Sequence, residues 1–272
     1  MSDMWNGAAS GWERNADTVD AHLAAATATL LDAAGVKDGS AVLDVAAGPG
    51  GAGLAAAARV GRSGSVVLAD VAPAMVEAAA RRSEGMANVR AVVCDELAID
   101  AADATFDAVI CRHGLMFVAE PADAVREASR VLRPAGRYAA MTWDARANNP
   151  WLGLILDAVG EQFGVPFPPP GMPGPFSLDE PDRLAQALAD GGLERVDVAR
   201  VAAPMTLPSL EAWWGRVPEL AGPLALALAG MEPDVRDAIR SRALAAGEAA
   251  ARTDGVGIQF DGSVLIVSGR RA

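Results

Sequence analysis

The sequence predicts an α/β fold with a doubly wound sheet and an additional helical segment. Apolar stretches of strand length alternate with alanine-rich stretches of helical character along most of the chain. The first apolar stretch, 41–45, runs into a turn rich in glycine and proline, 48–53, which leads into the alanine-rich run 54–58. A strand, a tight turn and a helix start in this order are typical of the opening of a nucleotide-binding βα unit.

The expected strands follow one another with helices between them. The fourth, 106–111, is apolar on both faces and is therefore predicted to lie at the centre of the sheet. A single helix over 17–34 is expected before the first strand. After the fourth strand the pattern gives a helix over 121–132, a turn at 134–136 and a strand over 137–143. The other expected strands are 65–69, 89–94 and 196–205, with a last strand or hairpin within 257–270.

The composition is that of a globular protein with room for one large domain and an insertion. The chain has 272 residues, of which 51% are hydrophobic and 21% are charged. Its 35 acidic and 23 basic residues give a net charge of -12, which argues against duplex nucleic acid as a partner. No secretory signal and no bilayer-spanning stretch are evident. We therefore expect a cytoplasmic protein, and a homodimer is compatible with this composition.

Two cysteines bear on the compartment and on metal binding. Cys94 and Cys111 both fall in expected buried strands. Two thiols in that setting indicate a reducing compartment and no disulfide framework. Their spacing does not match a set of metal ligands, so no metal site is expected.

Asp44 narrows the kind of ligand that the glycine turn can hold. The turn from Gly48 to Gly53 satisfies the pattern G-x-G-x-x-G, which is typical of dinucleotide sites. A carboxylate at the carboxyl end of the strand is badly placed for a pyrophosphate, but it suits a ligand that carries an ammonium or a sulfonium. Asp70 ends the second strand about 20 residues beyond the turn, where an acid can accept from two ribose hydroxyls. The pattern therefore predicts a nucleoside ligand.

Two motifs carry a resemblance to a known family. The stretch LDVAAGPG, 43–50, resembles the first motif of the class I S-adenosylmethionine-dependent methyltransferases, in the branch that includes ubiquinone/menaquinone C-methyltransferases and many small-molecule methyltransferases. Ala46 stands where that motif usually has glycine. The stretch RVLRPAG, 130–136, is similar to the family's R-V-L-K-P-G-G. With Asp70 and Asp95 spaced between them, the motifs cover residues 41–143.

The resemblance implies a Rossmann-like core of seven strands, with the last strand antiparallel at the sheet edge, and S-adenosyl-L-methionine as the cofactor. Asp95 matches the position that accepts the adenine amino group, and it ends the third strand as Asp44 and Asp70 end the first two. An N-terminal segment closes over the cofactor in this family, which makes Trp12 either a cofactor contact or, together with Trp5, an anchor of this segment to the core. The implied cofactor-binding residues are Trp12, Asp44, Ala46, Gly48, Gly50, Asp70, Val71, Met75, Cys94, Asp95, Glu96 and Cys111.

Methyl transfer from a sulfonium needs chiefly alignment of the acceptor, exclusion of water and, for some acceptors, removal of a proton. His113 follows the central strand and is interpreted as the base, or else as a residue that shapes the pocket. Arg112 would orient an anionic group of the acceptor or pair with an aspartate at the rim. His22 is interpreted as an ordinary surface or packing histidine.

The expected domain organisation has three parts. Residues 1–35 form a helical cover, 36–206 and 254–272 form the core, and 207–253 form a helical lid between the last two strands. Apolar and aromatic residues of the cover indicate a small, largely apolar acceptor, of a quinone type or from secondary metabolism, methylated at oxygen, nitrogen or carbon. These residues are Met116, Phe117, Trp151, Phe167, Met172, Phe176, Trp213 and Trp214.

Two other functions remain open at this point. A nicotinamide-dependent oxidoreductase would use the same glycine turn, but it would not need Asp44 and Asp95. A scaffold or cyclase with the methyltransferase fold would bind the cofactor through the same residues without transferring a methyl group.

Overall fold

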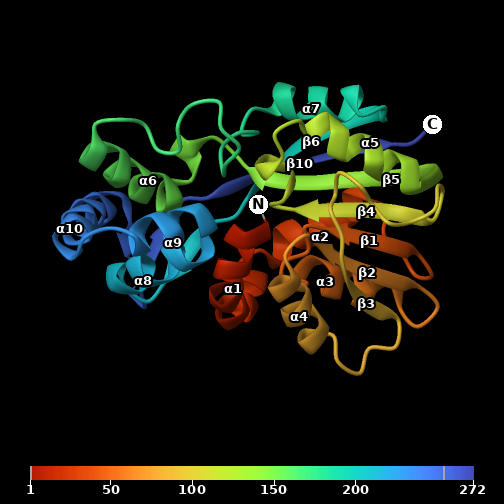
Figure 1. Ribbon diagram of the computed structural model, residues 1–272, viewed down its shortest axis with the longest axis horizontal. Coiled ribbons are helices and arrows are strands. Elements are labelled where there is room, and N and C mark those ends of the chain that lie inside the picture. The colour runs from red at the N-terminus through yellow and green to blue at the C-terminus, as the bar shows by residue number, and fades with distance from the viewer. Residues whose placement is uncertain (1, 254) are drawn as a thin grey trace.

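A seven-stranded sheet with the order β3-β2-β1-β4-β5-β10-β6 forms the larger lobe of the computed structural model, which describes residues 2–253 and 255–272 (Figure 1). Strands β1 to β5 are parallel to one another, and β10 runs antiparallel to both β5 and β6. The predicted doubly wound α/β fold is confirmed. The strands are β1 (Ala41–Val45), β2 (Ser65–Asp70), β3 (Val89–Val93), β4 (Phe106–Arg112), β5 (Leu132–Trp143), β6 (Glu194–Ala202) and β10 (Ser263–Arg270).

The last strand, β10, does not lie at the sheet edge as the resemblance implied, but between β5 and β6. Residues 264–267 of β10 are all buried, whereas β6 exposes side chains along its length. The run Val-Leu-Ile-Val is apolar on both faces, and such a strand is stable between two neighbouring strands and beneath helices. The half-polar β6 is the better edge strand.

Helices cover both faces of the sheet. α2 (Ala24–Ala33) and α3 (Gly51–Val60) pack on one face, and α5 (Pro121–Val131) and α7 (Pro181–Asp190) pack on the other (Figure 1). α4 (Pro73–Arg82) packs on β2 and β3. The small, fully buried alanines of α3, such as Ala56, allow this helix to approach the strands closely.

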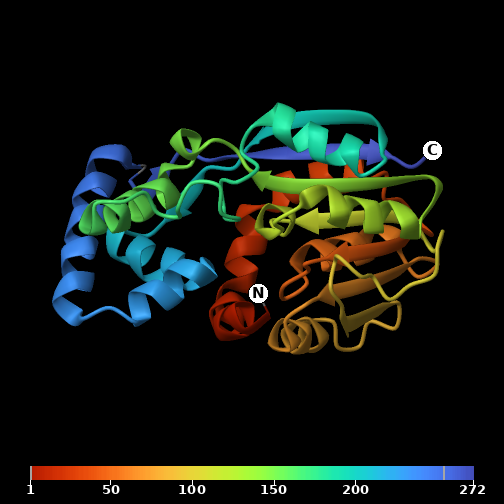
Figure 2. The same ribbon diagram turned by 45° about the horizontal axis from the view of Figure 1, so that its top comes forward.

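The N-terminal segment forms two helices where a single helix over 17–34 was expected. α1 (Ser2–His22) already begins at Ser2, and Leu23, with φ -94° and ψ 8°, interrupts the helical path before α2. Leu23 is buried, so the change of direction turns an apolar side chain into the core. α1 lies between the sheet and the second lobe, where it contacts α4 on one side and α8 and α9 on the other (Figure 2).

The second lobe is helical. It consists of α6 (Pro150–Phe163), α8 (Leu210–Leu220), α9 (Gly222–Ala229) and α10 (Pro233–Ala250), with a small sheet of β7 (Met205–Leu207), β9 (Ile258–Phe260) and β8 (Arg252–Thr253). α6 packs against α10. The expected strand 196–205 ends at Ala202, and residue 205 already belongs to the small sheet. Among the described residues, no helix combines the length and apolar character needed to cross a membrane.

The predicted turn at 134–136 is instead the beginning of β5. Ala135 has a φ of 67°, and the pairing of β4 with β5 shifts register between Phe106 and Ala108. Backbone groups of this irregular segment form hydrogen bonds with the C-terminal residues. Ala135 N–H donates to Arg271 O (3.1 Å), and Arg271 N–H donates to Gly136 O (2.9 Å). A bulged strand start therefore takes the place of a separate turn.

Candidate functional site

The turn after β1 places exposed backbone at the carboxyl edge of the sheet. Ala46, Gly48 and Gly50 have φ values of 52°, 54° and 89°. At Ala46 this is a conformation that a residue with a Cβ atom rarely adopts, and it falls where the motif usually has glycine. No atom lies within 4 Å of the position that a Cβ of Gly48 would take. This side of the turn therefore has room for a ligand to approach the backbone.

Asp70, at the end of β2, holds the turn in place. One carboxylate oxygen accepts from Gly48 N–H (2.8 Å), and the other accepts from Ala72 N–H (2.9 Å) just before α4. Burial raises the pKa of Asp70, although the backbone donors oppose this shift. The carboxylate is thus fixed at the edge of the sheet, with lone pairs left for a ligand.

A cavity with an empty volume of about 690 Å³ opens between this sheet edge and α1 and is called the first cavity below. α1 contributes Trp5 and Val19 to its wall, in addition to Trp12. Nine of the sequence-predicted site residues line it, namely Trp12, Ala46, Gly48, Asp70, Val71, Met75, Glu96, Arg112 and His113.

Two acids with buried, unpartnered carboxylate oxygens among the described residues give this region an acidic character. Asp44 is fully buried, and neither carboxylate oxygen has a partner of normal hydrogen-bond geometry in the described part of the chain. Burial raises its pKa to about 7, although Arg112 and the backbone of Gly53 oppose the shift. Burial likewise raises the pKa of Glu96 to about 7, with Asp70 and Asp95 adding to the effect. A cationic group in the first cavity would stabilise the ionised form of both acids.

Five of the predicted cofactor-binding residues do not line the first cavity: Asp44, Gly50, Cys94, Asp95 and Cys111. Asp95 is exposed, and its carboxylate accepts from Leu97 N–H (2.9 Å) within the turn after β3. The acid of this strand end that lines the first cavity is Glu96, which is partly buried. Cys111 is fully buried in β4, where burial raises the pKa of its thiol well above the ordinary value.

Arg112 is held by α1 and α2. Its Nη2 donates to Asp20 Oδ1 (2.8 Å) and its Nη1 donates to Thr27 Oγ1 (3.2 Å). The second oxygen of Asp20 accepts from Arg82 Nη2 (2.7 Å), and Arg82 also donates to the carbonyl of Pro49 in the glycine turn (2.9 Å). Of the two roles expected for Arg112, the structure contains the pairing with an aspartate.

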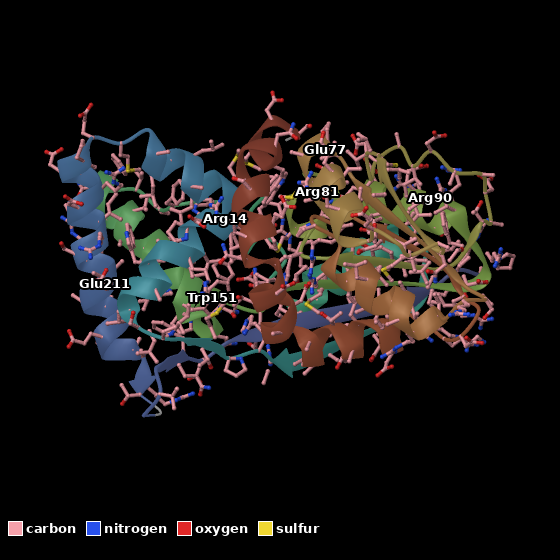
Figure 3. All side chains as sticks on the ribbon, turned by 90° about the horizontal axis from the view of Figure 1, so that it is seen from below. Arg14, Glu77, Arg81, Arg90, Trp151 and Glu211 are labelled. Carbon is pink, nitrogen blue, oxygen red and sulfur yellow. The ribbon has the colours of Figure 1, made fainter. Side chains whose placement is uncertain are left out.

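A second ion pair joins α1 to α4 further out. Arg81 makes two hydrogen bonds of 2.8 Å to the carboxylate of Glu13. Figure 3 shows Arg81 at the boundary between the two helices. α1 is therefore fastened at two points along the rim of the first cavity.

His113 lies where the first cavity meets another. Its backbone is left-handed, with a φ of 63°, and its ring stacks on Trp143 at 4.0 Å between centroids. Neither ring nitrogen has a hydrogen-bond partner in the described residues. Burial, and next to it the charge of Arg112, lower the pKa of His113 well below its ordinary value. The ring is therefore neutral near pH 7.

The second cavity has an empty volume of about 620 Å³ and mostly apolar walls. It shares Val19, Leu23 and His113 with the first cavity, so the two are adjacent. Sequence reasoning missed several residues of its wall, for which the helical and strand patterns give no local signal: Trp5, Val19, His22, Leu23, Trp143, Met205, Val217 and Leu220.

The aromatic residues expected in the cover divide into two groups. Met116, Phe117 and Trp151 line the second cavity, and Trp151 lies on the inner side of the helical lobe (Figure 3). Trp213 is fully buried, packs on Phe260 and donates from Nε1 to the carbonyl of Trp151 (2.6 Å). Trp213 therefore packs behind Trp151 and does not itself line the cavity. The others that do not line the cavity are Phe167, Met172, Phe176 and Trp214.

The sheet order and the acid-rich glycine turn define a nucleotide-binding α/β domain suited to a cationic ligand. Comparison with known proteins shows what this domain is similar to. Residues 42–136 match the family model described as "Methyltransferase domain". The chain is 35% identical over 136 residues to the "Ubiquinone/menaquinone biosynthesis C-methyltransferase UbiE" of Azotobacter vinelandii, a match that covers 49% of this chain and 53% of the relative. It therefore spans about half the length of that relative.

Solved structures agree at the level of the fold. The geranyl diphosphate C-methyltransferase from Streptomyces coelicolor, in complex with S-adenosyl-L-homocysteine, superposes with a TM-score of 0.52 at 18% identity, over 92% of this chain and 80% of that chain. The [4+2]-cyclase SpnF superposes with a TM-score of 0.56 at 20% identity, over 90% and 80% of the two chains. The match of residues 42–136 to the family model and the similarity to the ubiquinone/menaquinone C-methyltransferase agree with the resemblance of the sequence motifs to class I S-adenosylmethionine-dependent methyltransferases.

S-adenosylmethionine fits the donor set of the first cavity. Its positive sulfonium suits a site in which Asp44 and Glu96 are buried without a cation in contact. Its ribose hydroxyls suit the fixed carboxylate of Asp70.

Proposed function

We propose that this chain is an S-adenosylmethionine-dependent methyltransferase that methylates a small, largely apolar molecule at oxygen, nitrogen or carbon. The observation that carries the proposal is the meeting of the two cavities at His113. One cavity offers acids and exposed backbone, and the other offers apolar and aromatic walls. A cofactor and an acceptor bound in these cavities would meet at one place.

In this proposal Asp70 binds the ribose and Glu96 serves the adenine side, because Asp95 faces solvent. Trp12, Val71 and Met75 supply apolar surface to the cofactor. Asp44 does not line the first cavity, and in this proposal its negative charge stabilises the positive sulfonium from below the glycine turn. In this proposal Gly50, Cys94 and Cys111 do not contact the cofactor directly.

The bound cofactor supplies a methyl group on a sulfonium, which is already activated for in-line displacement. The contribution of the protein is therefore alignment and the exclusion of water. α1 closes the first cavity through the pairs that Asp20 makes with Arg82 and Arg112. The rings of Trp5 and Phe117, edge to face at 5.0 Å between centroids, close the junction with apolar surface.

The acceptor is defined by parts of the chain outside the family match. Within residues 42–136 only His113, Met116 and Phe117 line the second cavity. The other lining residues come from α1 and Leu23, β5, α6, the loop at Pro175, and the segments around Met205 and α8. The acceptor therefore need not be that of the relatives. A quinone-type or secondary-metabolite acceptor stays a proposal that rests on the apolar, aromatic wall.

The organisation into parts is also a proposal: 1–35 as cover, 36–206 and 254–272 as core, and 207–253 as lid. It is supported by the side chains that α1 and α8 give to the second cavity. We further propose a cytoplasmic location, because both cysteines are free thiols. The acidic net charge supports a small molecule and not nucleic acid as the partner. A homodimer stays a prediction, which a measurement of molecular mass in solution tests.

The nicotinamide alternative is disfavoured by electrostatics. A pyrophosphate next to Asp44 and Glu96 would meet carboxylate oxygens that are buried without hydrogen-bond partners among the described residues. The cyclase alternative shares the fold with SpnF, but no residue of this chain favours it over methyl transfer.

Calorimetric titration of the purified protein with S-adenosylmethionine, S-adenosylhomocysteine and NAD tests the binding step. We expect the first two to bind and Asp70→Ala to weaken both. Radiolabelled methyl transfer into an extract of the host then tests the reaction. Binding of NAD alone would overturn the assignment, and binding without any labelled product would support the scaffold or cyclase.

A further inference from the structure

Three aromatic rings lead from the start of α6 to the junction of the two cavities. Trp151 meets Trp143 edge to face, with 4.8 Å between the ring centroids and 73° between the ring planes. Trp143 in turn stacks on His113 at 4.0 Å. We call Trp151, Trp143 and His113 the aromatic row. All three line the second cavity, and His113 also lines the first, so the row ends where the two cavities meet.

The orientation of the His113 ring depends on this row. Both ring nitrogens are buried without a hydrogen-bond partner in the described residues. The backbone N–H of His113 donates to Met141 O (2.9 Å), but this bond fixes the main chain and not the ring. The last side-chain torsion of histidine is broad, so packing must hold the ring in place. That packing is the stack on Trp143.

Asn149 fixes the far end of the row. Its side chain is fully buried. Oδ1 accepts from Trp151 Nε1 (3.2 Å) and from Ser263 N–H (3.1 Å). Nδ2 donates to the carbonyl oxygens of Asp144 (2.9 Å) and Ser263 (3.0 Å). One amide group therefore uses both of its N–H groups and accepts two hydrogen bonds.

These bonds join segments that are far apart in the sequence. Asp144 directly follows β5, where the chain leaves the sheet for the helical lobe, and Ser263 begins β10, where the chain returns. The buried carboxylate of Asp144 also accepts from Ser263 Oγ (2.7 Å) and from Arg200 Nε of β6 (2.6 Å). Moving Asn149 would leave several buried polar groups without partners, which is costly. The point that holds Trp151 is therefore rigid.

Building on the function proposed above, we infer that Asn149 is a positioning residue, which through Trp151 and Trp143 holds the ring of His113 at the junction. Asn149 itself lines neither of the two cavities. An acceptor that binds against the aromatic row meets a wall that is already in place. Less entropy is then lost on binding, and the acceptor is aligned with the cofactor.

Nuclear magnetic resonance of the two histidines tests this inference in the whole chain without any ligand. The carbon-bound protons of a ring that stacks on an indole resonate upfield, because the ring current of the indole shields them. We therefore expect an upfield Hε1 signal from His113, assigned with His113→Gln. Asn149→Ala should move this signal towards that of an unstacked histidine.

Asn148→Ala is the matched control. Asn148 belongs to the same turn and donates from Nδ2 to Asp144 Oδ2 (2.7 Å), but it is exposed and does not bond to Trp151. It should leave the His113 signal in place. Trp151→Phe is a milder variant, since it removes the N–H that Asn149 accepts and keeps an aromatic ring. It should move the signal in the same direction, and the double variant should move it no further than Asn149→Ala alone.

A second measurement follows the reaction. In the radiolabelled assay with saturating cofactor, Asn149→Ala should lower the rate roughly 10- to 100-fold, because a small misplacement of the acceptor is costly. Its affinity for S-adenosylhomocysteine, measured by calorimetry, should stay unchanged, and Asn148→Ala should keep the wild-type rate. Thermal midpoints show that each variant is folded at the temperature of measurement.

The outcomes separate this inference from the function on which it rests. An unmoved His113 signal in folded Asn149→Ala, or an equal shift in Asn148→Ala, would overturn the role of Asn149. A loss of affinity for S-adenosylhomocysteine as large as the loss of rate would also overturn it, because the effect would then not be specific to the acceptor wall. Absence of labelled product from the wild type would overturn the proposed methyltransferase activity, whereas the histidine signals would still decide whether Asn149 positions the row.

Discussion

Asp20 of α1 accepts a hydrogen bond of 2.8 Å from Arg112 at the end of β4 and so closes the N-terminal helix over the first cavity. The Arg112 side chain is only 9% exposed, and that of Asp20 is 26% exposed. A charge that loses its partner in such a place is costly, because water cannot fully replace the hydrogen bond.

Asp20→Asn is therefore expected to destabilise the protein by about 1–3 kcal/mol and to weaken cofactor binding roughly tenfold. Chemical denaturation and calorimetric titration measure the two effects. Glu13→Gln on the same helix is the matched control, because its partner Arg81 is exposed and such pairs contribute little. Equal effects from both variants would show that closure of α1 does not depend on the buried pair.

The buried acid Asp44 predicts an unusual dependence of stability on pH. Its pKa is about 7 in the folded protein, against an ordinary value of 3.8. A carboxyl with a raised folded pKa stabilises the protein below pH 4, and this contribution is lost as the pH rises through 7. For Asp44 it corresponds to about 4 kcal/mol in the absence of ligand.

Asp44→Asn removes this term and keeps the shape of the side chain. The free energy of unfolding is measured by urea denaturation. The value for the variant minus the value for the wild type should increase as the pH rises from 4 to 8. Taking the difference between the two proteins cancels the opposing contributions of other acids, such as Asp144, whose pKa is lowered by Arg200 against the effect of burial. A constant difference across this range would mean that Asp44 is ionised throughout.

Local signals sufficed for the centre of the fold and for much of the first cavity. Each of the strand ends at Asp44 and Asp70 is marked by an apolar run followed by an acid and a turn, and parallel strands bring their carboxyl ends together. The sequence did not show whether β6 or β10 lies inside the sheet. Which of the two strands is buried on both sides depends on their pairing in the folded protein.

Two functional details were beyond local reasoning. Asp95 and Glu96 are adjacent acids, and the hydrogen bond from Leu97 N–H to Asp95 directs Glu96, not Asp95, into the first cavity. His22 gives no local signal for its place in the wall of the second cavity, because that wall is assembled from segments distant in the sequence. Contacts of this range are set by the docking of α1 between the two lobes.

Gly53 should not tolerate a side chain. A Cβ atom at this position in the first turn of α3 would clash with Leu68 and would lie 2.8 Å from Asp44 Oδ2. Gly53→Ala is expected to destabilise the protein by roughly 1–3 kcal/mol or more and to weaken cofactor binding, because the helix must move away from β1. The comparison is Gly215→Ala in α8, where no atom lies within 4 Å of a Cβ, and where stability should stay equal or rise by up to about 1 kcal/mol. A neutral Gly53→Ala would show that α3 can shift freely.

The charge of the cofactor should be visible as proton release. Near pH 7 Asp44 and Glu96 are partly protonated, because burial raises the pKa of each to about 7. A sulfonium favours their ionised forms and lowers both pKa values, so binding of S-adenosylmethionine should release protons to the buffer. The product S-adenosylhomocysteine carries no charge on sulfur and should release fewer.

Calorimetric titration at pH 7 in phosphate and in Tris, which differ in ionisation enthalpy, measures the number of protons released. The double variant Asp44→Asn with Glu96→Gln should lose the difference between the two ligands, provided that it still binds both. If wild-type protein releases the same number of protons with either ligand, the two acids do not respond to the sulfonium. The charge of the acids could then not be the reason that this glycine turn prefers S-adenosylmethionine to a pyrophosphate.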